Sequence, residues 1–337
     1  MNVLPLGKLP PELLARLLKE APNFDQRLIV GPGVGLDCAV VALGETCLVF
    51  KSDPITFATD KIGWYAVQVN ANDIATTGAT PRWFLATMLL PEGTATSEDV
   101  ENISRQIYDA CTSLEISVIG GHTEITYGLE RPIIAGTMIG EVPQEALITP
   151  KGASPGDHIL LTKGVPIEGT AILAREFAQK LDETCTSEEI QRARAYLYDP
   201  GISVVREARL AIQSGKVSAM HDPTEGGLAG ALWELAEACG HRLVIDPEAV
   251  YIPPIAQKIC GYFGVNPLET IASGALLLTA PAVEAVRICD SLRDAGVKCS
   301  VIGLVESGPA QVLESTADGR VPLPQPARDE IARIFEG

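Results

Sequence analysis

The stretch HDPTEGGLAGALWELAEACG, residues 221–240, predicts the end of a strand, a glycine-rich turn and a helix. Gly226, Gly227 and Gly230 open this helix. Its first backbone N–H groups have no partner within the helix, so they can receive a phosphate. The same glycines serve close packing of a helix on a sheet equally well. The stretch therefore predicts an α/β unit and leaves two interpretations of its turn open.

Four further segments place a carboxylate inside or beside a glycine-rich or turn-forming sequence. They are GVGLDCAV (33–40), FKSDPITFATDKIG (50–63), NANDIATTGATP (70–81) and GGHTEIT (120–126). Glycine lets the backbone approach a ligand closely, and turns present side chains at the rim of a scaffold. Acidic residues placed there are candidates for holding hard cations between protein and phosphate. The pattern predicts a metal-nucleotide site.

Charge and composition narrow the class of ligand. Of 337 residues, 43 are acidic and 26 basic, which gives a net charge of -17. This charge opposes binding to a polyanion through a general basic surface, so nucleic acid is not an expected partner. An acidic protein can still bind a nucleotide when divalent ions screen the phosphates. The balance of charge fits Mg²⁺ and ATP.

Cysteine usage and apolar runs indicate the compartment. The eight cysteines form no CxxC pair and have no close spacing with the four histidines, so no structural zinc site is expected. We interpret all eight as core or surface thiols. The N-terminal sequence MNVLPLGKLPPELL lacks the pattern of a signal or transit peptide, and no run approaches the ~20 apolar residues of a membrane span. We expect a soluble protein of the reducing cytoplasm, without a membrane partner.

The length predicts two domains of ordinary size. The turn-rich segment KGASPGD (151–157) places their boundary near residue 155, so the expected domains are 1–155 and 156–337. Both are expected to mix helices and strands, and no repeat of fixed period supports a duplication. In the first domain we expect helices at 10–22, 60–78 and 97–115, and strands at 38–44, 46–53, 82–91, 116–121 and 132–142. In the second we expect helices at 166–180, 187–197, 201–214, 226–239 and 282–295, and strands at 158–164, 217–222, 242–246, 274–281, 299–307 and 310–315.

Two aspartates are expected at strand ends. GPGVGLD (31–37) is neither a Walker loop nor a dinucleotide-binding fingerprint, and Asp37 in it is either a ligand or a solvated residue of a mobile loop. Asp53 stands between Ser52 and Pro54, where an Asp-Pro pair alone is typical of a turn starter. Rim positions of this kind suit metal ligands.

A third aspartate lies near the middle of a predicted helix. Asn70, Asn72 and Asp73 have poor helix propensity there, so another interaction is expected to compensate. If this helix meets Asp37 and Asp53, three carboxylates lie close together. Like charges ~5 Å apart repel by roughly 3 kcal/mol at an effective dielectric near 20. The arrangement therefore predicts a bound cation.

The GGHTE segment (120–124) combines two glycines with a histidine and an acid. A bulge or tight turn explains the glycines without any function. His122 is expected to orient a ligand or form hydrogen bonds, because Mg²⁺ prefers oxygen ligands.

In this order and spacing, the segments resemble the aminoimidazole ribonucleotide (AIR) synthetase-like superfamily, over nearly the whole chain. This superfamily includes selenophosphate synthetase, thiamine-monophosphate kinase and the hydrogenase expression/formation protein E branch, and the last is the closest. GGHTE, HDPTEGGLAGALWELAEA and GVNPLETIASGALLL (264–278) look like that branch's GGHTE, HDPTRGGL and DPL…ANEG segments.

The resemblance implies a two-domain α+β or α/β fold. Strands of the N-terminal domain would pair with a second subunit to form a barrel, giving a homodimer with a C-terminal α/β domain and Mg²⁺-ATP in the cleft. The implied metal and phosphate ligands are Asp37, Asp53, Asp73 and Glu124. Further implied nucleotide contacts are Asn72, Gly120, Gly121, His122 and Asp222.

The sequence departs from that branch in three places. The branch ends in a tail whose terminal cysteine carries a carbamoyl group, whereas this sequence ends PQPARDEIARIFEG, with no cysteine beyond Cys299. Glu225 stands where the branch usually has arginine, and ASG (272–274) replaces ANEG. The usual carbamoyl chemistry is therefore not expected.

The resemblance leaves more than one function open. The leading hypothesis is an ATP-dependent enzyme that activates or phosphorylates an oxygen, of the carbonyl or amide type, on an unidentified small molecule. The alternatives are a phosphotransferase of the thiamine-monophosphate kinase type, a non-catalytic nucleotide-binding factor acting on a maturation partner protein, and a dimeric structural protein that keeps only the fold.

Overall fold

The computed structural model describes residues 4, 9–33, 35–56, 58 and 60–336. Val34 in the segment 33–40, and Phe57 and Thr59 in the segment 50–63, lie outside the described residues. The chain forms two compact units. The N-terminal unit comprises Phe24–Gly31 and Asp37–Leu147, and the C-terminal unit comprises Met1–Asn23, Pro32–Leu36 and Ile148–Gly337. The last change of unit lies between Leu147 and Ile148, and the expected boundary near residue 155 stays a prediction. The assignment of residues 1–23 and 32–36 to the C-terminal unit was not predicted.

The N-terminal unit contains an open six-stranded sheet with the order β1-β2-β3-β6-β4-β5. Its strands are β1 (Leu28–Val30), β2 (Ala39–Leu43), β3 (Thr46–Ile55), β4 (Thr80–Pro91), β5 (Ser117–Thr126) and β6 (Ile133–Pro143). Neighbouring strands are antiparallel except β4 and β5, which are parallel. The five predicted strands are confirmed, and the short β1 was not predicted.

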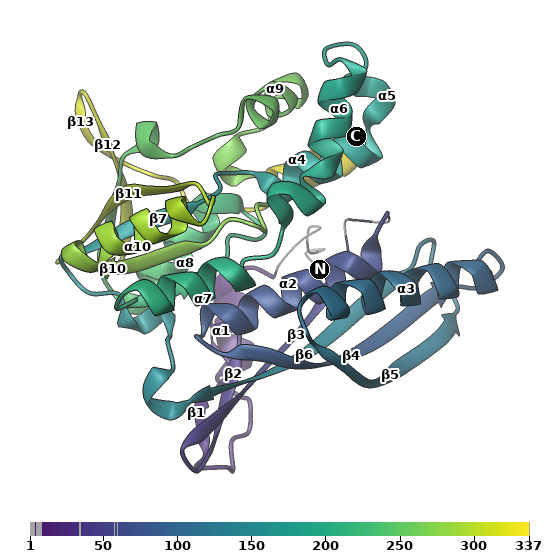
Figure 1. Ribbon diagram of the computed structural model, residues 1–337, viewed down its shortest axis with the longest axis horizontal. Coiled ribbons are helices and arrows are strands. Elements are labelled where there is room, and N and C mark those ends of the chain that lie inside the picture. Colours follow the sequence, from purple (N-terminus) through teal and green to yellow (C-terminus); the bar gives the residue numbers. More distant parts are fainter. Residues whose placement is uncertain (1–3, 5–8, 34, 57, 59, 337) are drawn as a thin grey trace. The chain divides into compact units, whose positions relative to one another are not determined.

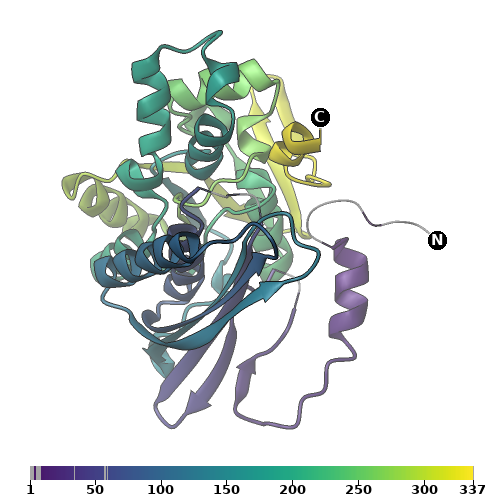
Figure 2. The same cartoon turned by 90° about the vertical axis from the view of Figure 1, so that its right-hand side faces the viewer.

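Two helices, α2 (Ile62–Thr76) and α3 (Ser97–Ser113), cover one face of this sheet (Figures 1 and 2). Helix α2 is buried along almost its whole length. Gly136 on β6 permits this close approach, because a Cβ atom there would lie 2.5 Å from Nδ2 of Asn70. Helix α3 begins with a complete capping box between Thr96 and Asp99. The helix begins at Ser97, as the predicted range 97–115 has it, and its N-cap is Thr96.

The edge strand β5 carries the GGHTE segment. The strand continues through Gly120 and Gly121, and a bulge lies where Val118 pairs with Phe84 and Gly120 pairs with Leu85. The bulge explanation of the glycines is therefore correct. Every residue of β5 is exposed except the last, which is half-buried.

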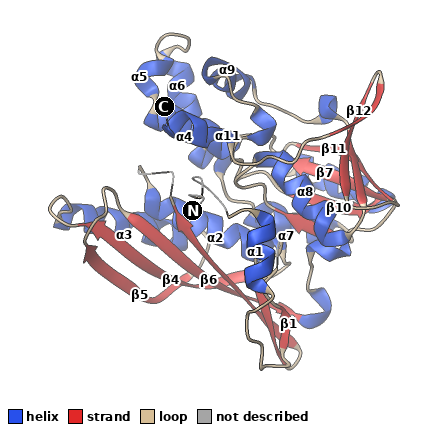
Figure 3. Ribbon diagram, turned by 180° about the vertical axis from the view of Figure 1, so that it is seen from behind, coloured by secondary structure: helices blue, strands red, loops and turns tan. Residues whose placement is uncertain are grey.

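The C-terminal unit contains a seven-stranded sheet with the order β13-β12-β9-β11-β7-β10-β8, in which only β12 and β9 are parallel neighbours. Its strands are β7 (Asp157–Thr162), β8 (Ala219–His221), β9 (Arg242–Ile245), β10 (Leu277–Pro281), β11 (Cys299–Glu306), β12 (Gln311–Thr316) and β13 (Gly319–Pro322). Its helices are α1 (Pro11–Leu18), α4 (Ile167–Glu176), α5 (Ala178–Leu181), α6 (Ser187–Ala195), α7 (Val205–Ser214), α8 (Gly227–Cys239), α9 (Pro254–Phe263), α10 (Ala282–Asp294) and α11 (Glu330–Glu336). Figure 3 distinguishes these helices from the strands. Strand β13 and helices α9 and α11 were not predicted.

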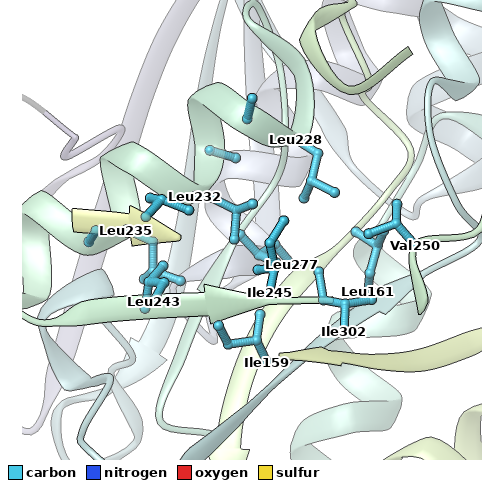
Figure 4. Packing of buried hydrophobic residues seen from close by; sticks show 14 of the residues in the cluster. Ile159, Leu161, Leu228, Leu232, Leu235, Leu243, Ile245, Val250, Leu277 and Ile302 are labelled. Carbon is cyan, nitrogen blue, oxygen red and sulfur yellow. The ribbon is translucent and has the colours of Figure 1, made fainter. Parts of the chain in front are cut away.

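A hydrophobic core joins α8 to this sheet. Leu228, Leu232 and Leu235 of α8 lie at helical spacing and face Leu243 and Leu277 of the strands (Figure 4). Helices α7 and α10 pack on each other, and α10 also packs on β7, β10 and β11. Because its apolar face is buried against the sheet, α8 holds the glycine turn that precedes it in place. No helix in the described ranges is both long enough and apolar enough to span a membrane.

Candidate functional site

A lysine that the sequence analysis did not select lies among three of the predicted acids. Nζ of Lys51 is 3.1 Å from Oδ2 of Asp73, 3.4 Å from Oδ2 of Asp53 and 3.9 Å from Oδ1 of Asp37. All four residues belong to the N-terminal unit. We call this group the Lys51 cluster. The structure thus brings together Asp37, Asp53 and Asp73, which are far apart in sequence.

Strand alternation explains why Lys51 and Asp53 point the same way. Along β3 the residues Cys47 and Val49 are fully buried, so every second residue faces the side covered by α2. Lys51 and Asp53 continue this series. Strand β3 runs on through Pro54, so Asp53 does not start a turn. A strand that looks apolar therefore delivers one cation and one anion to its covered face.

Two hydrogen bonds fix helix α2 against these residues. Nδ2 of Asn70 donates to the backbone oxygen of Asp53 at 3.2 Å. The same nitrogen also donates to the backbone oxygen of Ala66 within the helix, at 2.8 Å. The thiol of Cys38 donates to the backbone oxygen of Asp73 at 3.3 Å, which holds the residue after Asp37 against the helix. Cys38 is therefore a structural thiol in the described structure. Asn72, which is fully buried, lies on the same helix.

The electrostatics of the cluster follow from its burial. Burial raises the pKa of Asp73 to about 7; Lys51 opposes this shift, and Asp37 and Asp53 add to it. Burial alone would lower the pKa of Lys51, but the three carboxylates raise it well above its usual value. The side chain of Asp73 is 2% exposed, whereas those of Asp37 and Asp53 are 29% and 35% exposed. The cluster is thus a partly open acidic site with one internal cation.

The expected cation is therefore supplied in part by the protein itself. One lysine does not neutralise three ionised carboxylates, and the remaining negative charge with several oxygen donors suits a hard cation such as Mg²⁺. Within the described residues, no group of three or more His, Cys, Asp or Glu side chains has the arrangement of a metal site. The assignment of Asp37, Asp53 and Asp73 as metal ligands stays a prediction. It requires their side chains to turn from Lys51 toward the ion.

Glu124 is not part of the Lys51 cluster. Along one line across the sheet, Asp53 pairs with Gly136, Gly136 with Ala86, and Ala86 with Gly121. Three strand spacings of ~4.8 Å place β5 on the order of 14 Å from β3. The structure therefore does not bring Glu124, His122, Gly120 or Gly121 to the three aspartates within one chain. His122 and Glu124 instead face each other, with Nε2 and Oε2 3.4 Å apart, and both are exposed.

In the C-terminal unit, the predicted residue Asp222 follows strand β8 and is fully buried. Its neighbour His221 is also buried, and its Nε2 lies 2.7 Å from Oε2 of Glu234 on α8. This pair ties the end of the strand to the helix. The HDPTEGG segment is thus a rigid strand-to-helix turn.

The glycine turn before α8 already receives an anion from the same chain. The backbone N–H of Gly226 donates to Oδ2 of Asp329 at 2.7 Å, and the other oxygen of Asp329 accepts from the N–H of Ile331 at 2.8 Å. Gly226 and Gly227 have positive φ angles of 84° and 60°, which favour glycine. One of the donors that the sequence analysis offered to a phosphate is therefore occupied by a carboxylate. No local pattern around Asp329 predicts this contact, which joins residues 103 positions apart.

Two matches decide the family. The family model described as AIR synthase related protein, N-terminal domain, matches residues 35–142, and the one described as its C-terminal domain matches residues 154–315. The chain belongs to the AIR synthase-related family. Its two-domain α/β fold is therefore the fold that the resemblance implied.

Similar proteins agree with this assignment. A hydrogenase expression/formation protein of Methanocaldococcus jannaschii is 28% identical over 97% of both chains. A carbamoyl dehydratase HypE of Cupriavidus necator is 30% identical over 71% of this chain and 66% of its own. A solved hydrogenase maturation protein HypE in complex with ATP has a TM-score of 0.72 and 23% identity, over 95% of this chain and 91% of that one. AaThiL complexed with AMPPCP and TMP has a TM-score of 0.72 and 20% identity, over 94% of both chains.

This AIR synthase-related protein has a second acidic group, in the C-terminal unit, that sequence reasoning missed. The pKa of Glu168 on α4 is raised to about 8, mainly by burial; Glu225 and Asp329 contribute to this shift, and hydrogen bonds with Ser273 oppose it. Burial also raises the pKa of Asp329 to about 6, although hydrogen bonds from Ile331 and Gly226 oppose the shift. Both carboxyls therefore hold a proton more firmly in the folded chain than in the unfolded chain.

This group predicts a pH-dependent stability. A carboxyl whose pKa is raised by folding binds an extra proton in the folded state, so the free energy of unfolding falls as pH rises from about 4.5 to 8. The fall is on the order of 1.4 kcal/mol per pH unit over which only the folded form is protonated. Glu168→Gln removes the Glu168 contribution. We expect the variant to match the wild type at pH 5 and to melt at a higher temperature at pH 8.5.

Thermal unfolding between pH 5 and 8.5 checks this expectation. Glu248→Gln, at an exposed position of the same unit, is the matched control and should leave the pH profile unchanged. Parallel profiles for wild type and Glu168→Gln would contradict the assignment.

Proposed function

We propose that this protein is an ATP-dependent enzyme that transfers the γ-phosphoryl group of ATP to an oxygen of a small molecule. In this proposal Asp37, Asp53 and Asp73 hold Mg²⁺ ions against the phosphates of the nucleotide. The observation that carries it is the Lys51 cluster, in which three carboxylates converge on one cation in a partly open site. Such a group serves a polyphosphate bound with divalent ions better than it serves stability.

The chemistry of phosphoryl transfer supports this assignment. Catalysis of this reaction consists mainly of positioning and of neutralising charge on the phosphate oxygens. When bound, Mg²⁺ supplies that neutralisation. Lys51 can move from the carboxylates to a phosphate oxygen, because the incoming ions replace it as their counter-charge. Asp73, with a pKa of about 7, can lose its proton when the ions arrive.

The acceptor is proposed to be a carbonyl or amide oxygen. The relatives named carbamoyl dehydratase and the ATP complex of a similar fold support ATP-dependent activation of this class of group. The acceptor oxygen attacks the γ-phosphorus while the bond to the bridging oxygen breaks and ADP leaves. In the dehydration of a primary amide, the C–O bond then breaks, the oxygen departs with the phosphate, and the nitrogen loses its two protons, one to the phosphate and one to solvent. ADP and inorganic phosphate are then the released products.

A second candidate is a phosphotransferase, which keeps the phosphate on the acceptor. The fold similarity to AaThiL, a structure complexed with AMPPCP and TMP, favours it. A third candidate is a non-catalytic nucleotide-binding factor that acts on a maturation partner protein. It would bind ATP without turnover.

Product analysis separates the three. The protein is incubated with Mg²⁺, ATP and panels of carbamoyl compounds, amides and thiamine monophosphate, and products are followed by phosphorus NMR. Acceptor-dependent release of inorganic phosphate supports the leading proposal. A stable phosphorylated acceptor identifies a phosphotransferase, and ATP binding without turnover across the panels supports the non-catalytic factor. Absence of any ATP binding would contradict all three.

We also propose a homodimer formed through β5. This strand ends the sheet with exposed backbone and with the exposed apolar side chains Val118, Ile119 and Ile125. An unprotected edge of this kind pairs readily with another strand. Pairing with a second copy would give Gly120, Gly121, His122 and Glu124 a neighbour that one chain does not provide.

Light scattering tests this assembly. The wild type is expected at twice the chain mass of 35.7 kDa, and Ile119→Lys should shift the population toward the monomer, because it places a charge in the apolar strand surface. Val283→Lys, at an exposed position on α10, should remain dimeric. A monomeric wild type would rule the assembly out.

A further inference from the structure

A pocket in the C-terminal unit is basic although the protein is strongly acidic. Its volume is about 380 Å³, and it lies among the end of α6, the segment Leu197–Gly201, the start of α7 and the turn before β11. Four cationic side chains line it, against two carboxylates, Asp199 and Glu207. The chain as a whole has 26 basic and 43 acidic residues. The proposed ATP site does not include this pocket.

The most buried part of the lining contains an ion pair between Lys163 and Glu207, and one carboxylate oxygen of Glu207 accepts no hydrogen bond from the described residues. Nζ of Lys163 lies 3.1 Å from Oε1 of Glu207 and donates to the backbone oxygens of Gly201 and Ser203. Both side chains of the pair are nearly inaccessible, at 5% and 6% exposure. In the described part of the chain, Oε2 of Glu207 is buried and accepts no hydrogen bond. Because a buried carboxylate oxygen without a donor is costly, this atom indicates a ligand that carries a donor.

Three cations at the exposed side of the pocket are not neutralised. Nη2 of Arg206 donates to the backbone oxygen of Ala295 at 2.8 Å, which leaves its other N–H groups available. Nζ of Lys298 lies over the ring of Tyr251, 3.1 Å from its centroid, which orients the ammonium group. Among the described residues, neither these two cations nor Arg192 forms an ion pair.

We propose that this pocket binds a small phosphorylated polyol. Its phosphate would be held by Arg192, Arg206 and Lys298, and one of its hydroxyl groups would donate to Oε2 of Glu207. Arginine presents planar donors that match phosphate oxygens, and lysine adds a point charge. At ~30 Å³ for each water-sized group, the pocket holds on the order of a dozen non-hydrogen atoms, which is the size of a sugar phosphate. The exposed side of the pocket would thus bind the anionic end of the ligand, and its buried side would bind a hydroxyl group.

Calorimetric titration with three probes tests this assignment on the full chain. Glycerol 3-phosphate carries both groups, inorganic phosphate carries the anion, and glycerol carries the hydroxyls. We expect glycerol 3-phosphate to bind at least about tenfold more tightly than inorganic phosphate, and glycerol to show no binding. Each tenfold change corresponds to about 1.4 kcal/mol. Equal affinity for the two phosphates would overturn the role of Glu207.

One double variant and two control variants locate the binding. Arg192→Gln combined with Lys298→Gln should weaken glycerol 3-phosphate binding at least about tenfold, whereas Arg209→Gln on α7, outside the pocket, should not change it. Asp53→Asn, which damages the proposed ATP site, should also leave it unchanged. Binding that survives the double substitution, or that disappears in Asp53→Asn, would overturn the proposal. These outcomes are independent of whether ATP is turned over.

Discussion

Replacement of Asp73 with asparagine is expected to lower Mg²⁺-dependent ATP turnover at least about 100-fold, which corresponds to roughly 2.7 kcal/mol of transition-state stabilisation. Asp73 is the most buried carboxylate of the Lys51 cluster, and its Oδ2 lies 3.1 Å from Nζ of Lys51. Asparagine keeps the shape of the protonated acid but cannot supply the negative oxygen that a divalent ion requires. Folding should be preserved, because the pKa of about 7 means that the acid is already protonated in much of the population near neutral pH.

The same pKa predicts how Mg²⁺-ATP binding depends on pH. The ion binds the carboxylate form, so the affinity should rise as pH rises from 6 to 8 and should level off once Asp73 is ionised. Asp73→Asn should remove this dependence. Steady-state turnover and equilibrium binding at several pH values measure both effects. Asp109→Asn, at an exposed position on α3, is the matched control. Turnover by Asp73→Asn at the wild-type rate would refute the role of this residue.

The second large effect is expected from Lys51→Met. Lys51 is the only cation paired with three carboxylates in the described part of the N-terminal unit, and its side chain is 12% exposed. Removing it leaves Asp73 buried beside two like charges. Loss of one partner of a buried ion pair costs about 3–5 kcal/mol. We expect a loss of this order at pH 8 and a smaller loss at pH 5, where Asp73 is protonated.

Mg²⁺ provides the sharper test of the Lys51 variant. If the three carboxylates can hold a divalent ion, Mg²⁺ should raise the melting temperature of Lys51→Met more than that of the wild type, because the ion replaces the lost ammonium group. Arg105→Met, at an exposed position on α3, should lose little stability and gain none from Mg²⁺. A Lys51→Met protein as stable as the wild type, or one indifferent to Mg²⁺, would contradict this account of the cluster.

The sequence predicts those residues of the site that interrupt a local helix or strand pattern. Asn72 and Asp73 stand out because polar residues with poor helix propensity interrupt an apolar helix, and that signal is local. Lys51 gave a weaker signal of the same kind. In VFKSD, a charged residue takes the place of a buried one in the two-residue period of a strand, with Val49 two residues before it and Asp53 two residues after it. Attention to that period would have found the lysine.

Other features depend on contacts that no local pattern encodes. Asp329 reaches the glycine turn before α8 from a position 103 residues further along the chain. Glu168 has a perturbed pKa because of where α4 packs, and the surrounding sequence IEGTAILA predicts only a helix. Glu124 is a case in which a local motif was recognised but its position in the fold was not. The order of the strands places it three strand spacings from Asp53. Long-range packing therefore sets both what sequence analysis missed and which predicted residues one chain does not bring together.

The most direct measurement is a calorimetric titration of the wild type, and of a protein carrying Asp37→Asn, Asp53→Asn and Asp73→Asn together, with a non-hydrolysable ATP analogue. The titration is run with and without Mg²⁺. The account predicts that the wild type binds the analogue tightly only with Mg²⁺, and that the triple variant, although folded, does not bind it under either condition. Binding of equal affinity in the two proteins, or binding by the wild type that does not depend on Mg²⁺, would contradict the claim that the Lys51 cluster is a metal-nucleotide site.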